Sequence, residues 1–199
     1  MNVIKQLEEL KKLSSEIRLA AEEWDENWKI LLSTLLSART RDEVTIPVSE
    51  KLFNAYKTIE ELSKASLKDI QKIIKPVNFY KNKSKNLLNC AKVIYENYNS
   101  EVPLDFDKLI ELPGVGRKTA NVFLSEIGEP AIGVDTHVFR IAKELGWSKG
   151  NKPEKVEQDL KILFPKEYWI NVNSILVRFG KTYTKKSEFK ELINKVKLI

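Results

Sequence analysis

The sequence contains very little of the residues that bind transition metals or form cross-links. Its 199 residues include one cysteine, Cys90, and one histidine, His137. A single cysteine excludes a disulfide within the chain and any multi-cysteine metal site, and one histidine leaves little to ligate zinc. We therefore expect no transition-metal site.

Long apolar runs are also missing. No stretch approaches the roughly 18 consecutive apolar residues of a membrane-spanning helix. The segment Met1–Gln6 lacks the apolar core of a signal peptide. These absences predict a soluble, intracellular protein without a membrane partner.

Acidic residues are outnumbered by basic ones, with 28 Asp and Glu against 34 Lys and Arg, which gives a net charge of +6. This excess favours a polyanionic partner, because neutralised phosphates release condensed counterions. Most of the lysines are expected to form an ordinary solvated surface. Arginine is scarce, and four of the six arginines lie in the motifs described below: Arg39, Arg41, Arg117 and Arg140.

Strand signals are absent, since there is no sustained alternation of apolar and polar residues and no Asn-Gly turn. Apolar residues instead recur at three- and four-residue spacing, which is typical of helices. The first such stripe predicts one amphipathic helix from Val3 to Trp24. Later helix starts are predicted at Asp25, Thr58, Ser66, Asp135, Pro153 and Ser187, with an end at Gly146 and a helix over Tyr168–Phe179. The predicted fold class is all-α.

The most informative segment is Leu112-Pro113-Gly114-Val115-Gly116-Arg117-Lys118-Thr119-Ala120-Asn121. Residues 105–112 and 117–127 suit short helices, and the glycines between them permit a tight reversal. The free amides and the dipole at the start of the second helix favour an anion, so phosphate can bind there. An ordinary helix–helix corner fits this segment equally well when it is taken alone.

Further blocks accompany the hairpin in order. They are Leu35-Leu36-Ser37-Ala38-Arg39-Thr40-Arg41-Asp42, Asn78-Phe79-Tyr80, Val134-Asp135-Thr136-His137-Val138-Phe139-Arg140 and the region Val156–Gln158. With the hairpin, they resemble the helix-hairpin-helix DNA glycosylases, in particular endonuclease III, over roughly residues 28–184.

The resemblance implies two helical lobes, with DNA and the active site along the groove between them. Residues 25–133, which contain the hairpin, would form one lobe. Residues 1–24 and 134–199 would form the other. The implied partner is double-stranded DNA that contains damaged bases or abasic sites, bound by a monomer in the cytoplasm or nucleoid.

Two residues are candidates for catalysis. Cleavage of an N-glycosidic bond builds positive charge on the sugar, which a carboxylate stabilises, and Asp135 is our candidate for this role. A helix start favours its ionised form, although Asp135 could simply be a cap. By resemblance, Lys118 is the nucleophile that forms a Schiff base and permits β-elimination. Its place in a first helical turn predicts a lowered pKa, while the alternative is a phosphate-binding surface lysine.

Reaching that bond requires flipping a nucleotide out of the duplex. By resemblance, Arg39 plugs the vacated stack in place of the glutamine often found there, and Phe79 wedges the opposite strand. Core packing is an equal alternative for Phe79. We predict further DNA contacts at Asp42, Lys83, Pro113, Gly114, Val115, Gly116, Arg117, Thr119, His137 and Arg140.

The chain departs from endonuclease III after Phe179–Thr184, where that family normally has four cysteines around an iron–sulfur cluster. No cysteine follows here, and the cluster cannot form without its ligands. We expect the final helix to hold the C-terminal region by packing through Phe189, Leu192, Ile193 and Val196. The only cofactor considered is a monovalent cation at the hairpin carbonyls.

The function that we predict is a base-excision DNA glycosylase with abasic-site lyase activity on oxidised pyrimidines such as thymine glycol. Three alternative functions remain: a monofunctional mismatch or damaged-base glycosylase, an 8-oxoguanine-type glycosylase and lyase, and a non-catalytic DNA-binding module. The paired candidates Lys118 and Asp135 argue against the last of these.

Overall fold

The protein is all-helical. The computed structural model describes residues 2–199, and within them it contains α-helices, one short 3-10 helix and no strand. The chain divides into two compact units, one formed by Arg18–Ile127 and the other by Met1–Ile17 with Gly128–Ile199. The predicted class is thus confirmed, as is the arrangement of a continuous middle segment in one unit and both chain ends in the other. The units meet at residues 17/18 and 127/128, whereas the sequence predicts boundaries at residues 24/25 and 133/134.

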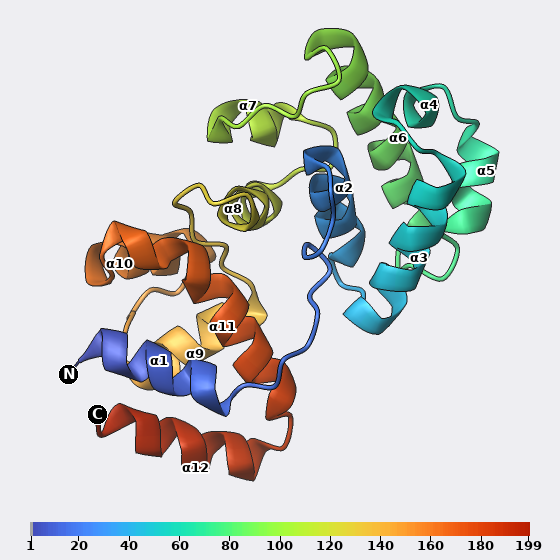
Figure 1. Ribbon diagram of the computed structural model, residues 1–199. Coiled ribbons are helices and arrows are strands. Elements are labelled where there is room, and N and C mark those ends of the chain that lie inside the picture. The colour runs from blue at the N-terminus through green and yellow to red at the C-terminus, as the bar shows by residue number, and fades with distance from the viewer. Residues whose placement is uncertain (1) are drawn as a thin grey trace. The chain divides into compact units, whose positions relative to one another are not determined.

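The middle unit is built around one buried helix. Its elements are α2 (Asn27–Ser37), α3 (Asp42–Ala55), α4 (Ile59–Ser63), α5 (Leu67–Ile73), α6 (Tyr80–Asn97), α7 (Phe106–Glu111) and α8 (Arg117–Glu126). Helix α2 packs against α3, α6 and α8 (Figure 1). Leu31, Leu32 and Leu36 of this helix are completely buried, as expected for a helix that is apolar almost all round.

The predicted helix starts in this unit depend on short polar side chains. The Thr58 hydroxyl accepts a hydrogen bond from the Glu61 amide at 3.1 Å, and Ser66 accepts from the Asp69 amide at 3.1 Å. Both starts are confirmed. The cap predicted at Asp25 is wrong, because α2 begins one residue later and the Asp25 carboxylate binds Lys29 Nζ at 2.8 Å instead.

Helix α1 (Val3–Leu13) is shorter than predicted, and its expected continuation to Trp24 is wrong. After Leu13 the backbone becomes extended, and the Ser14 hydroxyl donates to the Leu10 carbonyl at 2.7 Å. Leu19 is nevertheless 8% exposed, so the apolar stripe beyond Ser14 reflects burial without helix. Periodicity alone does not distinguish these two cases.

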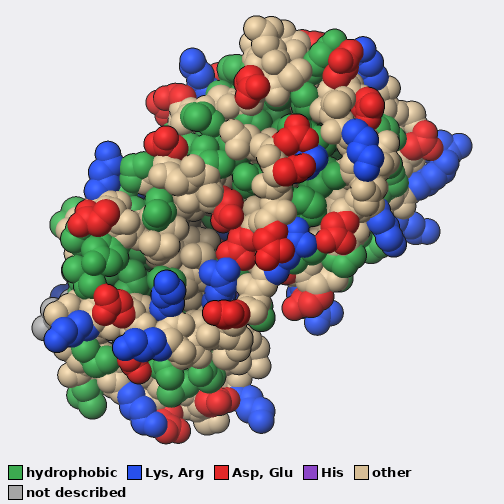
Figure 2. Space-filling view, in the orientation of Figure 1, with side chains coloured by type: hydrophobic (Ala, Val, Ile, Leu, Met, Phe, Trp, Pro, Cys, Tyr) green, Lys and Arg blue, Asp and Glu red, His purple; other side chains and the backbone are tan. Residues whose placement is uncertain are grey.

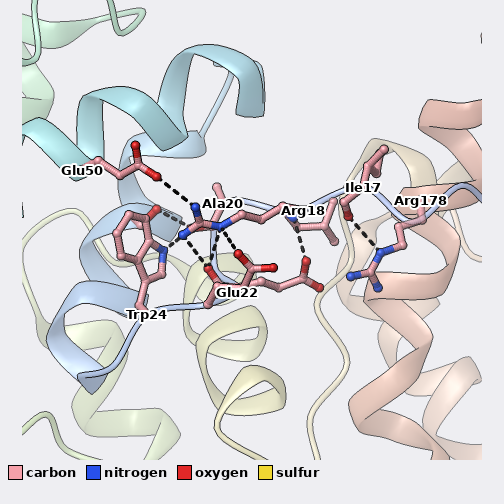
Figure 3. A network of polar contacts seen from close by, with 10 residues as sticks. Ile17, Arg18, Ala20, Glu22, Trp24, Glu50 and Arg178 are labelled. Atoms are coloured by element: carbon pink, nitrogen blue, oxygen red, sulfur yellow. Dashed lines mark hydrogen bonds and ion pairs between the residues drawn. The ribbon is translucent and has the colours of Figure 1, made fainter.

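Tertiary contacts of one arginine order the non-helical segment that follows (Figure 3). The Arg18 guanidinium lies 4.7 Å from the Trp24 ring and binds Glu50 Oε1 at 3.0 Å. Trp24 Nε1 donates to the Ala20 carbonyl at 2.7 Å. The Ala20 carbonyl, which a continued helix would have paired with the main-chain amide of residue 24, is thus paired with the indole of Trp24.

The unit of both chain ends comprises α1, α9 (Thr136–Leu145), α10 (Pro153–Leu163), the 3-10 helix η1 (Lys166–Tyr168), α11 (Trp169–Thr182) and α12 (Lys186–Lys197). Helix α11 packs against α1 and α9, and α12 packs against α9 and α1 (Figure 1). Buried Gln6 joins the ends of the chain, since it accepts from Trp147 Nε1 at 2.7 Å and donates to the Val196 carbonyl at 3.2 Å. In the same unit, Arg178 Nε donates to the Ile17 carbonyl at 3.1 Å (Figure 3).

Most predicted helix limits in this unit are confirmed. Gly146 ends α9 with a left-handed φ of 76°, and Pro153 is the first residue of α10. The helix predicted over Tyr168–Phe179 spans Trp169–Thr182, and the last helix begins at Lys186, one residue before the predicted Ser187. Differences of this size are usual at helix ends.

The surface is mixed in charge. On the face drawn in Figure 2, Lys and Arg side chains are interspersed with Asp and Glu over each unit. The net charge of +6 therefore does not form one continuous patch on this face. Among residues 2–199, no helix is long and apolar enough to cross a membrane.

Candidate active site

The predicted hairpin forms from α7, the five residues 112–116 and α8. Asp105 caps α7 by accepting from the Lys108 amide at 3.0 Å, and the Val115 amide closes the turn by donating to the Leu112 carbonyl at 3.0 Å. Gly114 has a φ of 81°, and a Cβ built there would lie 2.7 Å from the Asn86 Cβ. Glycine is thus required at residue 114 by both backbone conformation and space.

The second glycine has a different role. Gly116 precedes α8 with a φ of −95°, and nothing lies within 4 Å of a Cβ built on it. Its position lets the free amides at the start of α8 open onto the turn. The tight turn and the helix start that the sequence predicts are therefore both present.

The predicted hairpin contacts differ in accessibility. Gly114, Gly116 and Arg117 are exposed, and Pro113 is half-buried. Val115 and Thr119 are only 5% and 8% exposed, so little of either residue is accessible for the predicted DNA contacts. The Arg117 guanidinium carbon lies 4.9 Å from the Phe106 ring centroid, which restricts the arginine to one side of the hairpin.

Lys118 is the second residue of α8 and is half-buried. It therefore lies in the helical turn whose main-chain amides are free of intrahelical partners, as predicted. One turn further along α8, Asn121 is 2% exposed. Among the described residues, its amide nitrogen is the buried side-chain polar atom without a hydrogen-bond partner.

Asp135 belongs to the other unit, where it is the N-cap of α9. Its Oδ1 accepts from the amides of His137 and Val138, each at 2.9 Å, which confirms the predicted cap. Neither bond uses Oδ2. The preceding loop is fixed by buried Asn173, whose side-chain amide donates to the Gly133 carbonyl at 2.7 Å. The carboxylate is therefore held in one orientation by main-chain donors.

His137 and Arg140 lie on the first turns of α9, three residues apart. His137 is half-buried, and a Cβ built on Gly180 of α11 would lie 2.2 Å from its Nδ1. The imidazole thus occupies a place that exists only because residue 180 is glycine. Arg140 is exposed, and its guanidinium carbon lies 3.6 Å from the ring centroid of buried Phe189 in α12.

Arg39 and Phe79 form a pair on the middle unit. Both adopt left-handed backbone conformations, with φ values of 55° and 59°. The Arg39 guanidinium carbon lies 5.8 Å from the Phe79 ring centroid. Phe79 is 58% exposed, so its interpretation as a core residue is wrong. Left-handed non-glycine residues persist only when their surroundings enforce them, and they are common at functional sites.

Lys83 does not lie where a phosphate contact requires it. Its side chain is buried, and Nζ donates to the carbonyls of Leu36 and Ala38 at 2.7 and 2.5 Å and to Thr40 Oγ1 at 3.1 Å. The predicted direct contact with DNA is wrong for this reason. Burial lowers the pKa of Lys83 to about 8. Asp42, the first residue of α3, is also buried, at 9% exposure.

Sequence reasoning missed several polar residues that hold these sites in place. They are Thr40 and Asn173, together with the side-chain role of Asn78. A signal existed only for Asn173, which interrupts the apolar face of a predicted helix. The other roles depend on contacts between segments distant in sequence.

Candidate metal ligands are sparse in the described part of the chain. No group of three His, Cys, Asp or Glu side chains among residues 2–199 is arranged to hold a metal ion. Cys90 is buried in α6, and burial raises the pKa of its thiol to about 12, which makes the thiol unreactive.

Comparison with known proteins connects this geometry to an enzyme family. The family described as HhH-GPD superfamily base excision DNA repair protein matches residues 32–166. Endonuclease III of Thermotoga maritima is 43% identical over 159 residues, which cover 79% of this chain and 75% of that protein. Endonuclease III of Bacillus subtilis is 41% identical over 160 residues, covering 79% and 73%.

Solved structures agree with these sequence relatives. A trapped covalent intermediate of endonuclease III with DNA, in an estranged-adenine complex, has a TM-score of 0.84 and 34% identity, covering 92% of this chain and 86% of that one. A thermostable thymine-DNA glycosylase, at 20% identity and a TM-score of 0.76, shows likeness of fold alone. The chain therefore belongs to the HhH-GPD superfamily of base-excision repair proteins and is an endonuclease III-like DNA glycosylase and abasic-site lyase.

Proposed function

We propose that this enzyme removes oxidised pyrimidines such as thymine glycol from double-stranded DNA, with Lys118 as nucleophile and Asp135 as the stabilising carboxylate. The observation that carries the proposal is the position of Lys118, half-buried in the first turn of α8 directly after the hairpin. The solved relative that is a covalent endonuclease III–DNA intermediate supports it, because a covalent enzyme–DNA bond needs a nucleophile of this kind.

The proposed reaction begins when the neutral Lys118 amine attacks C1′ of the damaged nucleotide. The bond from C1′ to the base breaks, and the base leaves with the bonding electrons and takes up a proton. Opening of the sugar ring gives a Schiff base between Nζ and C1′. Loss of a C2′ proton then expels the 3′ phosphate by β-elimination and cuts the strand.

Asp135 would act on the charge that develops at the sugar. Two main-chain amides already donate to its Oδ1, and these bonds hold the carboxylate in one orientation. An ionised carboxylate stabilises the positive charge on the sugar as the base departs. Capping α9 and stabilising the transition state are compatible roles for one side chain.

The exposed pair of Arg39 and Phe79 would interact with the distorted duplex. Flipping costs a few kcal/mol of stacking and pairing, least for a damaged base. We propose that Arg39 fills the vacated place and that Phe79, 58% exposed, stacks against the opposite strand. Hairpin amides and Arg117 would hold the phosphates, with His137 and Arg140 contributing from α9.

The remaining proposals concern the setting of the reaction. We propose a monomer that acts on chromosomal DNA in the nucleoid, without an iron–sulfur cluster, since this sequence contains one cysteine. A monovalent cation at the hairpin would use main-chain carbonyls of the 112–116 turn. One of these, the Leu112 carbonyl, already accepts the Val115 amide and keeps a second lone pair.

The proposal is tested with labelled duplexes that carry thymine glycol or an abasic site. Base release and strand cleavage are followed separately for the wild type, Lys118→Ala and the control Lys92→Ala, which removes an exposed lysine from α6. We expect both activities in the wild type and the control, and loss of both in Lys118→Ala.

Other outcomes identify the alternatives. Base release without strand cleavage in the wild type would show a monofunctional glycosylase. Preference for duplexes that contain 8-oxoguanine would contradict the proposed pyrimidine substrate. Full activity of Lys118→Ala would contradict its role as nucleophile.

A further inference from the structure

The buried ammonium of Lys83 binds the turn that contains Arg39. An ammonium has three N–H donors, and the three bonds of Lys83 Nζ, to the Leu36 and Ala38 carbonyls and Thr40 Oγ1, match that number. Leu36 lies in the last turn of α2, whose carbonyls lack intrahelical partners. A positive charge is also favoured at this end of a helix dipole.

A second set of bonds connects the same turn to Phe79. The Asn78 side-chain amide donates to the Arg39 carbonyl at 2.5 Å, and the Asn78 main-chain amide donates to Thr40 Oγ1 at 3.2 Å. The three consecutive residues 38, 39 and 40 are thus each held through a polar atom. Thr40 Oγ1 joins the two sets, because it accepts from both Lys83 and Asn78.

These bonds explain how two strained residues remain in place. A left-handed conformation is unfavourable for a non-glycine residue, and Arg39 and Phe79 both adopt it. Neither side chain is buried, so core packing does not enforce the conformation. The polar bonds behind the turn are the restraints that remain. They fix the backbone of both residues as one body, with the guanidinium and the ring 5.8 Å apart.

We propose that Lys83 is a positioning residue, whose buried ammonium presents Arg39 and Phe79 to DNA as one preorganised pair. This rests on the proposed function, in which that pair enters the distorted duplex. Misplacement of such groups by about 1 Å can slow a reaction by on the order of 100-fold, although the positioning residue touches no substrate. Lys83 therefore contributes to base extrusion and takes no part in the chemistry at C1′.

The first test is a double-mutant cycle on the rate of base release from thymine glycol duplexes under single-turnover conditions. It compares the wild type, Lys83→Met, Arg39→Ala and the double variant. Lys85→Met is the matched control, since it removes an exposed lysine two residues along the same helix. We expect each single variant to be slower by on the order of 10- to 100-fold, with the double variant no slower than the slower single one.

A specific second readout separates positioning from loss of fold. Borohydride trapping on a preformed abasic site, where no base has to be extruded, should stay within about threefold of wild type in Lys83→Met. Asn78→Ala, at an exposed position, should reproduce the slow base release even if Lys83→Met folds poorly. Multiplicative effects in the cycle, or a Lys83→Met rate equal to that of Lys85→Met, would overturn the proposal.

A DNA-binding experiment tests the role of Lys83 independently of the proposed enzymatic function. Duplexes with 2-aminopurine beside a tetrahydrofuran abasic analogue report unstacking without any chemistry. We expect increased fluorescence with wild type and Lys85→Met, and little increase with Lys83→Met at equal DNA occupancy. If no lesion is processed, the proposed function fails, and this experiment still decides the role of Lys83. An equal increase in all three proteins, or none in the wild type, would overturn the proposal.

Discussion

Phe189→Ala tests what holds the C-terminal helix of this enzyme. Phe189 lies in α12, the last helix that the structure describes. The side chain is 3% exposed, its ring centroid lies 5.7 Å from that of Phe179, and the Arg140 guanidinium lies 3.6 Å away. These contacts join α12 to α11 and α9.

The expected loss of unfolding free energy in Phe189→Ala follows from two kinds of contact, apolar packing and the cation–π contact. Truncation of a buried phenylalanine to alanine costs about 3–5 kcal/mol. A cation–π contact contributes about 0.5–2 kcal/mol, depending on how far it is desolvated. Phe189→Leu retains apolar volume and loses the ring, so it should cost about 1–2 kcal/mol. For a chain of this size, each kcal/mol of lost stability lowers the melting temperature by about 2–4 °C. The melting temperature of Phe189→Ala should therefore lie well below that of the wild type.

The assay is urea and thermal unfolding followed by circular dichroism. Lys190→Ala, at an exposed position one residue away, is the control and should lie within about 0.5 kcal/mol of wild type. A double-mutant cycle of Arg140→Gln with Phe189→Leu isolates the cation–π term. Deletion of residues 187–199 should lower the melting temperature more than any single change. A Phe189→Ala protein as stable as the Lys190→Ala control would refute the reasoning.

Three further predictions follow from the geometry. Gly114→Ala should lower stability and weaken DNA binding, because residue 114 has a φ of 81° and its Cβ would lie 2.7 Å from the Asn86 Cβ. Gly116→Ala is the control and should fold normally, so equal melting temperatures of the two variants would contradict this prediction. Asp135→Asn should keep the α9 cap and an unfolding free energy within about 0.5 kcal/mol of wild type, yet slow base release at least about 100-fold. Asp135→Ala should slow base release and also lower the unfolding free energy by about 1 kcal/mol. An active Asp135→Asn would restrict Asp135 to capping. The pKa of Lys83 is lowered from 10.5 to about 8, so the unfolded chain binds more protons than the folded protein between these pH values. The unfolding free energy of the wild type should therefore increase relative to that of Lys83→Met as pH rises from about 8 to about 10.5. Urea unfolding at both ends of that window would show no such increase if the pKa were ordinary.

Local signals in the sequence predicted the fold class and most helix limits. Short polar caps such as Thr58 and Ser66, and breakers such as Gly146 and Pro153, act within one helical turn, so their effects are visible in sequence. The helix predicted through to Trp24 failed for the opposite reason. There the segment is held by contacts with residues distant in the chain, such as Arg18 with Glu50, which periodicity does not encode.

The candidate site shows the same difference between local motifs, which the sequence predicts, and contacts between distant residues, which it does not. The hairpin and the Asp135 cap are local motifs and were predicted in place. The sequence predicts a DNA contact at Lys83, whereas the acceptors that its Nζ binds lie some 45 residues earlier in the chain. Likewise, the close approach of His137 to Gly180 becomes visible only once α9 and α11 are packed together. Residue type identifies chemistry, but burial and distant partners decide which residues position it.

The most direct test of the central claim is to locate the covalent bond. The protein is incubated with an abasic-site duplex, reduced with borohydride, digested with trypsin, and the DNA-linked peptide is sequenced by mass spectrometry. We predict a single adduct on Lys118 Nζ, with no adduct in Lys118→Ala under the same conditions. An adduct on any other lysine in the wild type, or an undiminished yield in Lys118→Ala, would contradict Lys118 as the nucleophile.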